Sequence, residues 1–203
     1  MEIKQQFIPS PSKRSSGKQL NKVLYILAHD SGNDGATAQN NVDYYVRTAN
    51  ETEASAHFFV DDKIIINCIP ETLKAWHCRY NTAVAPNIAP HLMNDCAIAI
   101  ELCYGSAWGN LRNLVSYNNY TTLIASLCMK YNLDPETALV GHFQVDPTRR
   151  TDPLNAFKTM GKTWTQFKLD VKSKMNPIIQ EEMVNIPVKK SQVDKVLAYL
   201  KTI

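Results

Sequence analysis

The run Val23–Ala28 places the strongest constraint on how this chain can fold. Its side chains are all apolar or aromatic, so a strand formed from it carries hydrophobic groups on both faces. Such a strand is typical of the centre of a sheet that other elements cover on each side. With 203 residues, the chain is long enough to supply this cover within one domain.

Hydrophobic spacing predicts further elements around this strand. Apolar residues at helical intervals indicate a helix from Thr37 to Asn50 and another over Tyr117–Tyr131. His57–Val60 and Ile64–Cys68 are expected to pair as a hairpin around a polar turn.

Proline and glycine positions mark the segments between these elements. Residues 1–21 are expected to form an irregular lead-in, and Pro70–Asp95 a long ordered loop. A helix is expected to begin at Pro153 and to run to Val171, with Gly161 as its weak position.

The pattern changes near residue 176, so we expect two parts of unequal size. Residues 1–175 form the main domain, and 176–203 form a linker with a short amphipathic helix opened by a capping box at Ser191–Asp194. Because a helix of about a dozen residues is marginal alone, it is expected to dock on the body or to mediate self-association.

The segment Cys96–Leu102 is predicted to form a strand with a carboxylate near its end. Side chains alternate along a strand, which places Cys96, Ile98, Ile100 and Leu102 on one face and Ala97, Ala99 and Glu101 on the other. Glu101 beside alanines has room in front of it, as the floor of a cleft requires. A strand-end glutamate in solvent fits the same pattern, so this strand alone leaves both interpretations open.

Three residues are candidates for a metal site. His142 follows the apolar run 138–140, Asp152 lies beyond the next loop, and His29 closes the run Val23–Ala28. Two histidines and one carboxylate, with a fourth position left to water, are typical of a catalytic zinc site. A single histidine at a strand end is more often a structural residue, so spacing alone does not establish the site.

The other three histidines are assigned different roles. His57 begins an apolar strand and is expected to be buried and hydrogen-bonded. His77 lies beside Trp76 in a loop and suits the wall of a cleft, although a core role for Trp76 fits equally well. His91 lies between a proline and a leucine in a loop and is assigned no role.

Composition argues against several classes of protein. The net charge of +3 is mild, and we find no basic stripe interleaved with aromatic residues, so a nucleic-acid partner is not expected. Five cysteines without a C-x-x-C pair indicate free thiols in a reducing compartment. No segment has the pattern of a signal peptide or approaches the roughly 18 apolar residues of a membrane span. We therefore expect synthesis in the cytoplasm without an integral membrane segment.

Five sequence motifs together resemble a known family. They are residues 26–29 (ILAH), 55–58 (SAHF), 75–77 (AWH), 94–102 (NDCAIAIEL) and 141–153 (GHFQVDPTRRTDP). They occur in this order in the type 2 N-acetylmuramoyl-L-alanine amidases, which include phage endolysins, Bacillus autolysins and peptidoglycan recognition proteins. The resemblance covers roughly residues 22–170, and residues 55–105 are most similar to the Bacillus autolysin and endolysin branch.

The resemblance implies an α/β fold with a central mixed β-sheet flanked by helices. It implies one Zn²⁺ per chain on His29, His142 and Asp152, and a catalytic Glu101 that handles the proton of the attacking water. Arg150 stands where many members have lysine and is implied to stabilise the oxyanion, but the two side chains differ in shape and in proton transfer. T7-type members also have tyrosine where this chain has Ala56.

The implied activity is cleavage of the lactyl–L-alanine amide bond of peptidoglycan by a phage or prophage endolysin. Trp76 and His77 are candidates for binding the glycan or the stem peptide. A cytoplasmic enzyme without a leader would reach the wall after a holin opens the membrane. The alternatives are an amidase that recycles soluble muropeptides and a non-catalytic peptidoglycan-binding module.

Overall fold

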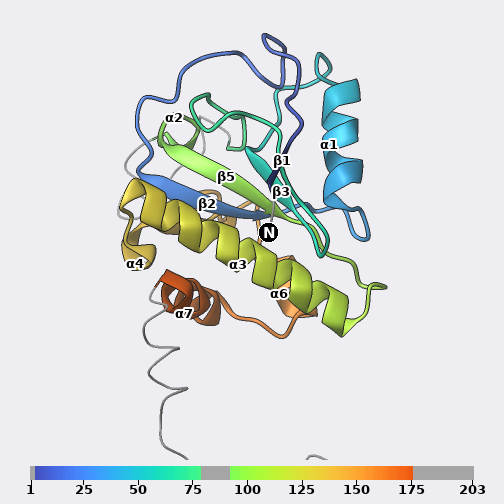
Figure 1. Cartoon of the computed structure of the whole chain (residues 1–203), viewed down its shortest axis with the longest axis vertical. Coiled ribbons are helices and arrows are strands. Elements are labelled where there is room, and N and C mark those ends of the chain that lie inside the picture. Colours follow the sequence, from blue (N-terminus) through green and yellow to red (C-terminus); the bar gives the residue numbers. More distant parts are fainter. Residues whose placement is uncertain (1–2, 79–91, 176–203) are drawn as a thin grey trace, which may run out of the picture.

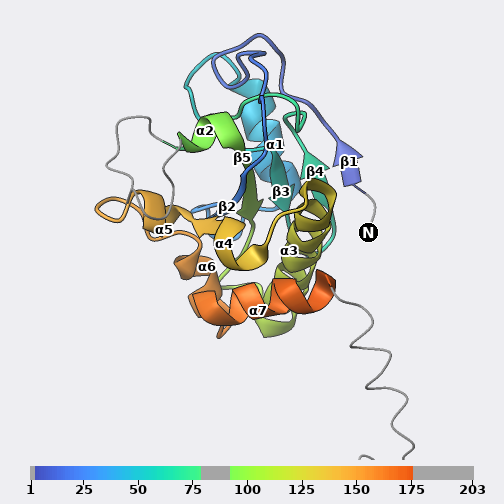
Figure 2. The same cartoon turned by 90° about the vertical axis from the view of Figure 1, so that its left-hand side faces the viewer.

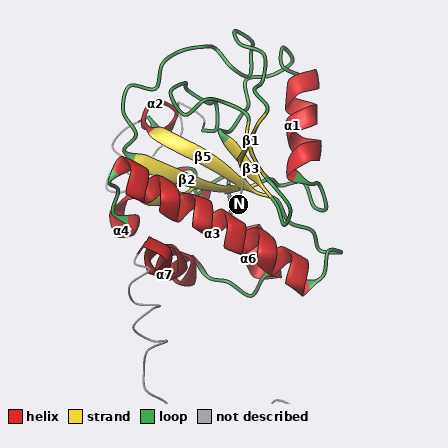
Figure 3. Cartoon of the chain, in the orientation of Figure 1, coloured by secondary structure: helices red, strands yellow, loops and turns green. Residues whose placement is uncertain are grey.

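The computed structural model describes residues 3–78 and 92–175. Its strands form one sheet, shown in Figures 1 and 3, in the order β1-β4-β3-β5-β2-β6. The strands are β1 (Ile3–Gln5), β2 (Tyr25–Asp30), β3 (Phe58–Val60), β4 (Ile65–Asn67), β5 (Ala97–Leu102) and β6 (Leu139–Gly141). Only the β3–β4 pair is antiparallel among these strands. The predicted α/β fold with a mixed sheet is confirmed, as is the β3–β4 hairpin. Strand β2 is interior, between β5 and the edge strand β6, and begins two residues later than the predicted run Val23–Ala28.

Three helices cover one face of the sheet, which we call the closed face. They are α3 (Asn110–Tyr131), α6 (Leu154–Thr159) and α7 (Trp164–Met175). Figure 2 shows α3 and α7 crossing beneath the strands. Ile98 and Ile100 of β5 pack here against Phe157 and Phe167. Full burial of such a side chain contributes about 1.5–3 kcal/mol, so this layer is a main source of stability.

The opposite face, which we call the open face, is covered only in part. Helix α1 (Ala38–Arg47) packs on β3 and β4, and Thr37 caps its N-terminus by accepting a hydrogen bond from Asn40 N at 3.1 Å. The predicted start of this helix is confirmed. Over β2 and β5, this face first carries Leu27 and Ala97, which pack with Met93 and Val145, and then His29, Ala99 and Glu101. The alternation predicted for β5 is confirmed from Ala97 onward.

Three short helices join the strands at their ends. They are α2 (Met93–Cys96), α4 (Pro135–Ala138) and α5 (His142–Val145). The assignment of Cys96 to the strand is wrong, because this residue ends α2 and packs with Ala97 and Leu27. The four residues of α2 are too few to show helical periodicity in the sequence.

Two other predictions about the chain are wrong. The lead-in contains β1, which pairs in parallel with β4 at the edge of the sheet. The helix expected from Pro153 to Val171 is divided into α6 and α7 around Gly161, whose φ of +63° is in the left-handed region that interrupts a helix.

Parts of the sequence interpretation lie outside the described residues. These are His91, the middle of the loop from Pro70 to Asp95, and the linker and helix predicted over 176–203. All five cysteines lie within the described residues, are free, and apart from half-buried Cys78 are buried, as predicted. No helix in the described part of the chain is long and apolar enough to cross a membrane.

Candidate metal centre and active-site pocket

The parallel strands bring the candidate metal ligands to one edge of the sheet. His29 is near the end of β2, and His142 directly follows β6, which pairs with β2 through Ala28 and Gly141. Asp152 returns to the same place because Phe143 N donates a hydrogen bond of 3.0 Å to its carbonyl oxygen. The carboxyl ends of parallel strands are where open α/β sheets bind ligands.

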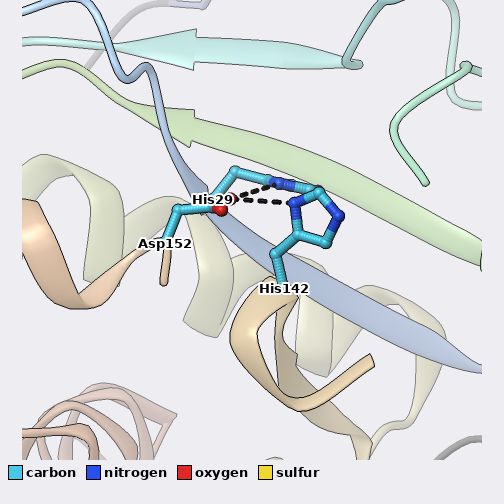
Figure 4. Close-up of side chains that lie close together, drawn as sticks. All are labelled: His29, His142 and Asp152. Atoms are coloured by element: carbon cyan, nitrogen blue, oxygen red, sulfur yellow. Dashed lines mark hydrogen bonds and ion pairs between the residues drawn. The ribbon is translucent and has the colours of Figure 1, made fainter. Parts of the chain in front are cut away.

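The three side chains point toward a common centre, as Figure 4 shows. The Nδ1 atoms of His29 and His142 lie 2.9 and 3.0 Å from Asp152 Oδ2. One ligand atom from each residue lies within 4.8 Å of the other two. All three side chains are buried. The sequence prediction therefore named three residues that the fold brings together, across separations of up to 123 positions.

This geometry fits a zinc ion. Bonds of about 2.0–2.2 Å in a tetrahedral site separate the ligand atoms by about 3.3 Å, so outward shifts of a few tenths of an ångström admit the ion. Two imidazole nitrogens and a carboxylate oxygen are a donor set that zinc accepts. Both rings form hydrogen bonds only within this group, through Nδ1 to Asp152, and their Nε2 atoms are buried without a hydrogen-bond partner among the described residues.

The protonation states also suit a cation. Burial, reinforced by the neighbouring His142, lowers the pKa of His29 to about 4. Burial alone would raise the pKa of Asp152, but hydrogen bonds from His142 and His29 outweigh it and hold the pKa below its usual range. At neutral pH His29 is neutral and Asp152 is ionised, the forms that bind a metal.

Glu101 lies on β5 beside this centre, in register with His29. Its side chain enters a cavity of about 460 Å³ that the three candidate ligands also line. Its Oε2 atom is buried without a hydrogen-bond partner among the described residues. Burial and the negative charges of Asp152 and Asp30 raise its pKa well above the usual range. Of the two interpretations left open by the sequence, the structure favours the floor of a cleft.

The cavity has walls of different character. One carries Arg149, Arg150 and Thr151, and Arg149 forms an ion pair with Asp146. Arg150 is exposed, and its positive charge partly offsets the negative charges around Glu101. The cavity therefore combines a cationic rim with an acidic floor.

His57 and His77 have different environments. Ala99 N donates to His57 Nδ1 at 3.0 Å, so the Nε2–H of His57 donates to Leu73 O at 2.9 Å. The predicted buried, hydrogen-bonded role of His57 is confirmed. His77 lines the cavity next to Trp76, its ring centroid is 5.6 Å from that of His29, and neither of its nitrogens has a described hydrogen-bond partner.

Sequence reasoning missed several residues that line the cavity. Tyr45 comes from α1, Glu53 and Ser55 from the loop after it, and Asp30 and Cys78 flank predicted site residues. Asp30 and Cys78 directly follow His29 and His77 in the sequence, and this adjacency could have identified them as site residues. Ser55 opens the motif at residues 55–58, so it too had a signal in the sequence. No motif marks Tyr45, because only the packing of α1 on the sheet brings it to the site.

Comparison with known proteins agrees with this fold. Residues 19–155 match the sequence model of the family Amidase_2, described as N-acetylmuramoyl-L-alanine amidase. The chain belongs to this family. The resemblance drawn from the five motifs is thereby confirmed.

Individual relatives give the same picture. The chain is 26% identical over 148 residues to the N-acetylmuramoyl-L-alanine amidase CwlL of Bacillus licheniformis, a match that covers 71% of this chain and 40% of the relative. The structure is similar to PlyL, with 30% identity, a TM-score of 0.67 and coverage of 86% of this chain and 99% of that one. A mutant endolysin from Bacillus subtilis has 25% identity, a TM-score of 0.66 and coverage of 84% and 99%. The chain thus spans about two fifths of the curated relative CwlL.

Proposed function

We propose that this protein is a zinc-dependent N-acetylmuramoyl-L-alanine amidase, which hydrolyses the amide bond between the lactyl group of N-acetylmuramic acid and L-alanine. The observation that carries the proposal is the convergence of His29, His142 and Asp152 beside Glu101 in an open cavity. Membership of the amidase family supports the choice of bond.

The three ligands would hold one zinc ion, and Glu101 would move the proton. Zinc bound there supplies a Lewis acid that polarises a carbonyl and acidifies water. Glu101, with its raised pKa, takes a proton from the attacking water and passes it to the nitrogen of the leaving L-alanine. The products are a free lactyl carboxylate and a peptide with a new L-alanine amino terminus.

Arg150 and the Trp76 loop have supporting roles in this proposal. Arg150 lies on the cavity rim and carries a positive charge, which suits stabilisation of the negative oxygen formed at the scissile carbonyl. Trp76 and His77 form part of the wall that would contact the glycan or the stem peptide.

The biological role we propose is host cell-wall lysis by a phage or prophage endolysin. The similarity to the endolysin from Bacillus subtilis supports this role. In this proposal the enzyme is made in the cytoplasm and reaches peptidoglycan after a holin opens the membrane. A cytosolic amidase for soluble muropeptides is the alternative, which the Thr151–Asp152–Pro153 context of the third ligand favours.

The test is a paired measurement on the wild type and Asp152→Ala. We expect one zinc per chain and new L-alanine amino termini from purified Gram-positive walls, with both lost in the variant. Asp62→Ala is the matched control, because Asp62 pairs with Arg112 outside the cavity. Zinc with cleavage of soluble muropeptides but not walls would favour the recycling enzyme. Wall binding without any cleavage would favour a binding module, and absence of metal under zinc-replete conditions would contradict the proposal.

A further inference from the structure

The N-terminal segment from residue 3 to residue 18 precedes the family match, yet it reaches the cavity wall. Backbone hydrogen bonds join Gln6 N to Asn67 O at 3.0 Å and Ile8 N to Cys68 O at 2.9 Å. Farther along, Arg14 N donates to Ala49 O at 3.0 Å. This route brings the Arg14 side chain to the C-terminal end of α1, behind the part of the wall that carries Tyr45 and residues 53–55.

Arg14 is the largest fully buried side chain among the described residues, with 1% of its surface exposed. Its Nε and Nη2 atoms donate to Thr48 O and Thr48 Oγ1 at 3.0 and 2.9 Å, and Nη1 donates to Ala54 O at 2.5 Å. Its guanidinium carbon lies 4.2 Å from the centroid of the Tyr45 ring. One side chain thus contacts the end of α1, the following loop and an aromatic residue of the cavity.

These contacts lead directly to the site. The Tyr45 ring packs edge-on against Phe59 at 5.1 Å, and Phe59 is the register partner of Glu101. On the loop side, Ser55 follows Ala54 and is tied to Trp76, because Ser55 N donates to Trp76 O at 3.0 Å and Trp76 N to Ser55 Oγ at 2.9 Å. We call this wall, made of Tyr45, residues 53–55 and Trp76, the α1 wall.

A buried guanidinium is an expensive way to fill space. Removing a charge from water costs several kcal/mol, and no described carboxylate forms an ion pair with Arg14. An apolar side chain could fill the same volume. Only arginine offers a rigid fork of donors that can fix two backbone segments and an aromatic face at once.

We propose that Arg14 is a positioning residue for substrate binding, which acts by holding the α1 wall opposite the metal ligands. This inference rests on the proposed amidase function. It adds a residue outside the matched family region to the machinery that binds the muramoyl peptide. Because Arg14 reaches the cavity only through other residues, its loss should weaken substrate binding more than the bond-breaking step.

The experiment uses the zinc-loaded full chain with the Arg14→Met and Arg14→Lys substitutions. The substrate is a soluble N-acetylmuramoyl tripeptide, and the readout is the appearance of the L-alanine amino terminus. For Arg14→Met we expect KM to rise about tenfold while kcat stays within about threefold and zinc remains one per chain. Arg14→Lys keeps the positive charge but loses the forked set of donors, so its KM should lie between those of the wild type and Arg14→Met.

Arg47→Met is the matched control, since Arg47 is an exposed residue of α1 that stacks on Tyr44 and does not line the cavity. Its KM should match the wild type. If both Arg14 variants keep the wild-type KM, the inference is wrong. It is also wrong if their only change is a fall in kcat and zinc content that matches the fraction of unfolded protein. If Arg14→Met does not fold, the KM of Arg14→Lys decides alone.

A binding measurement separates this inference from the proposed function. Calorimetry with the same muramoyl tripeptide in a Glu101→Gln background does not depend on turnover. A Kd raised about tenfold by Arg14→Met supports the positioning role even if the wild type cleaves nothing. Equal Kd values with and without Arg14 would overturn it even if the amidase activity is real.

Discussion

The two faces of the sheet differ in how many of their buried polar groups are paired, although Ser116 Oγ of α3 on the closed face also lacks a partner among the described residues. On the closed face, Tyr120 donates to His29 O at 3.2 Å and Tyr117 donates to Asp170 Oδ2 at 2.7 Å. In the cavity of the open face, five buried side-chain atoms lack a partner among the described residues. They are His29 Nε2, His142 Nε2, Glu101 Oε2 and both ring nitrogens of His77.

This difference separates structure from function within single strands. His29 and Asp30 are neighbours in β2. Asp30 also borders the cavity, but its carboxylate is held by a hydrogen bond from Ala156 N of α6, whereas His29 Nε2 has no partner among the described residues. Buried polar groups without partners are costly, so a fold retains them mainly where a ligand satisfies them. The open face should therefore control activity, and the closed face stability.

The largest effect is expected from Glu101→Gln on the open face. If this substitution left activity unchanged, the assignment of activity to the open face would be wrong. Glutamine keeps the size of the side chain but cannot transfer the proton, so kcat should fall about 10²–10⁴-fold. Zinc content and the thermal midpoint should stay close to wild type. Amine release and metal analysis on the same sample measure both. A variant that keeps full activity would remove Glu101 from the mechanism.

A second prediction concerns His57, a histidine on the open face whose nitrogens are both satisfied. Burial lowers its folded pKa to about 4, so the unfolded chain takes up its proton first as pH falls below about 6.5. Stability from neutral His57 is full above that pH and is lost on acidification toward 4.

Between pH 7 and pH 4, the free energy of unfolding of the wild type should thus fall by about 3 kcal/mol more than that of His57→Gln. Urea unfolding of both metal-free proteins measures the difference, and titration of His29 is common to both. Parallel pH curves would show that His57 does not titrate as its burial implies.

The smallest effect is expected on the closed face, from Tyr117→Phe. The change removes the hydrogen bond to Asp170, which keeps its contacts with Gln166 and Lys162, so unfolding should become easier by about 1–2 kcal/mol. KM and kcat per folded molecule should not change. An altered KM would show that the closed face influences the cavity and would weaken the comparison.

The sequence was most informative where one strong local pattern decides the structure. Val23–Ala28 located an interior strand to within two residues, and alternation after Cys96 placed Glu101 on the same face as Ala97 and Ala99. The positions of His29, His142 and Asp152 suggested a shared metal site, and the structure gives the reason, because the parallel strands β2 and β6 end at the same edge. The metal itself stays a prediction.

Patterns failed where packing, rather than local sequence, decides the outcome. The three exposed residues of β1 show no buried face and are ordered by backbone pairing with β4. Gly161 divides a continuous apolar stripe because its backbone, not its neighbours, ends α6. Arg14 resembles an ordinary surface arginine in sequence, and only the route of the N-terminal segment shows that it is buried.

The loop from His142 to Asp152 also bears on how the folded chain would respond to metal. An ion held there would join this loop to His29, 123 positions from Asp152 in the sequence, and so act as a removable cross-link across most of the domain. The unfolded chain lacks this arrangement of ligands, so bound metal would stabilise the fold by about 2.7 kcal/mol at a hundredfold excess over its Kd. A chelator would then shift the unfolding transition as well as stop catalysis.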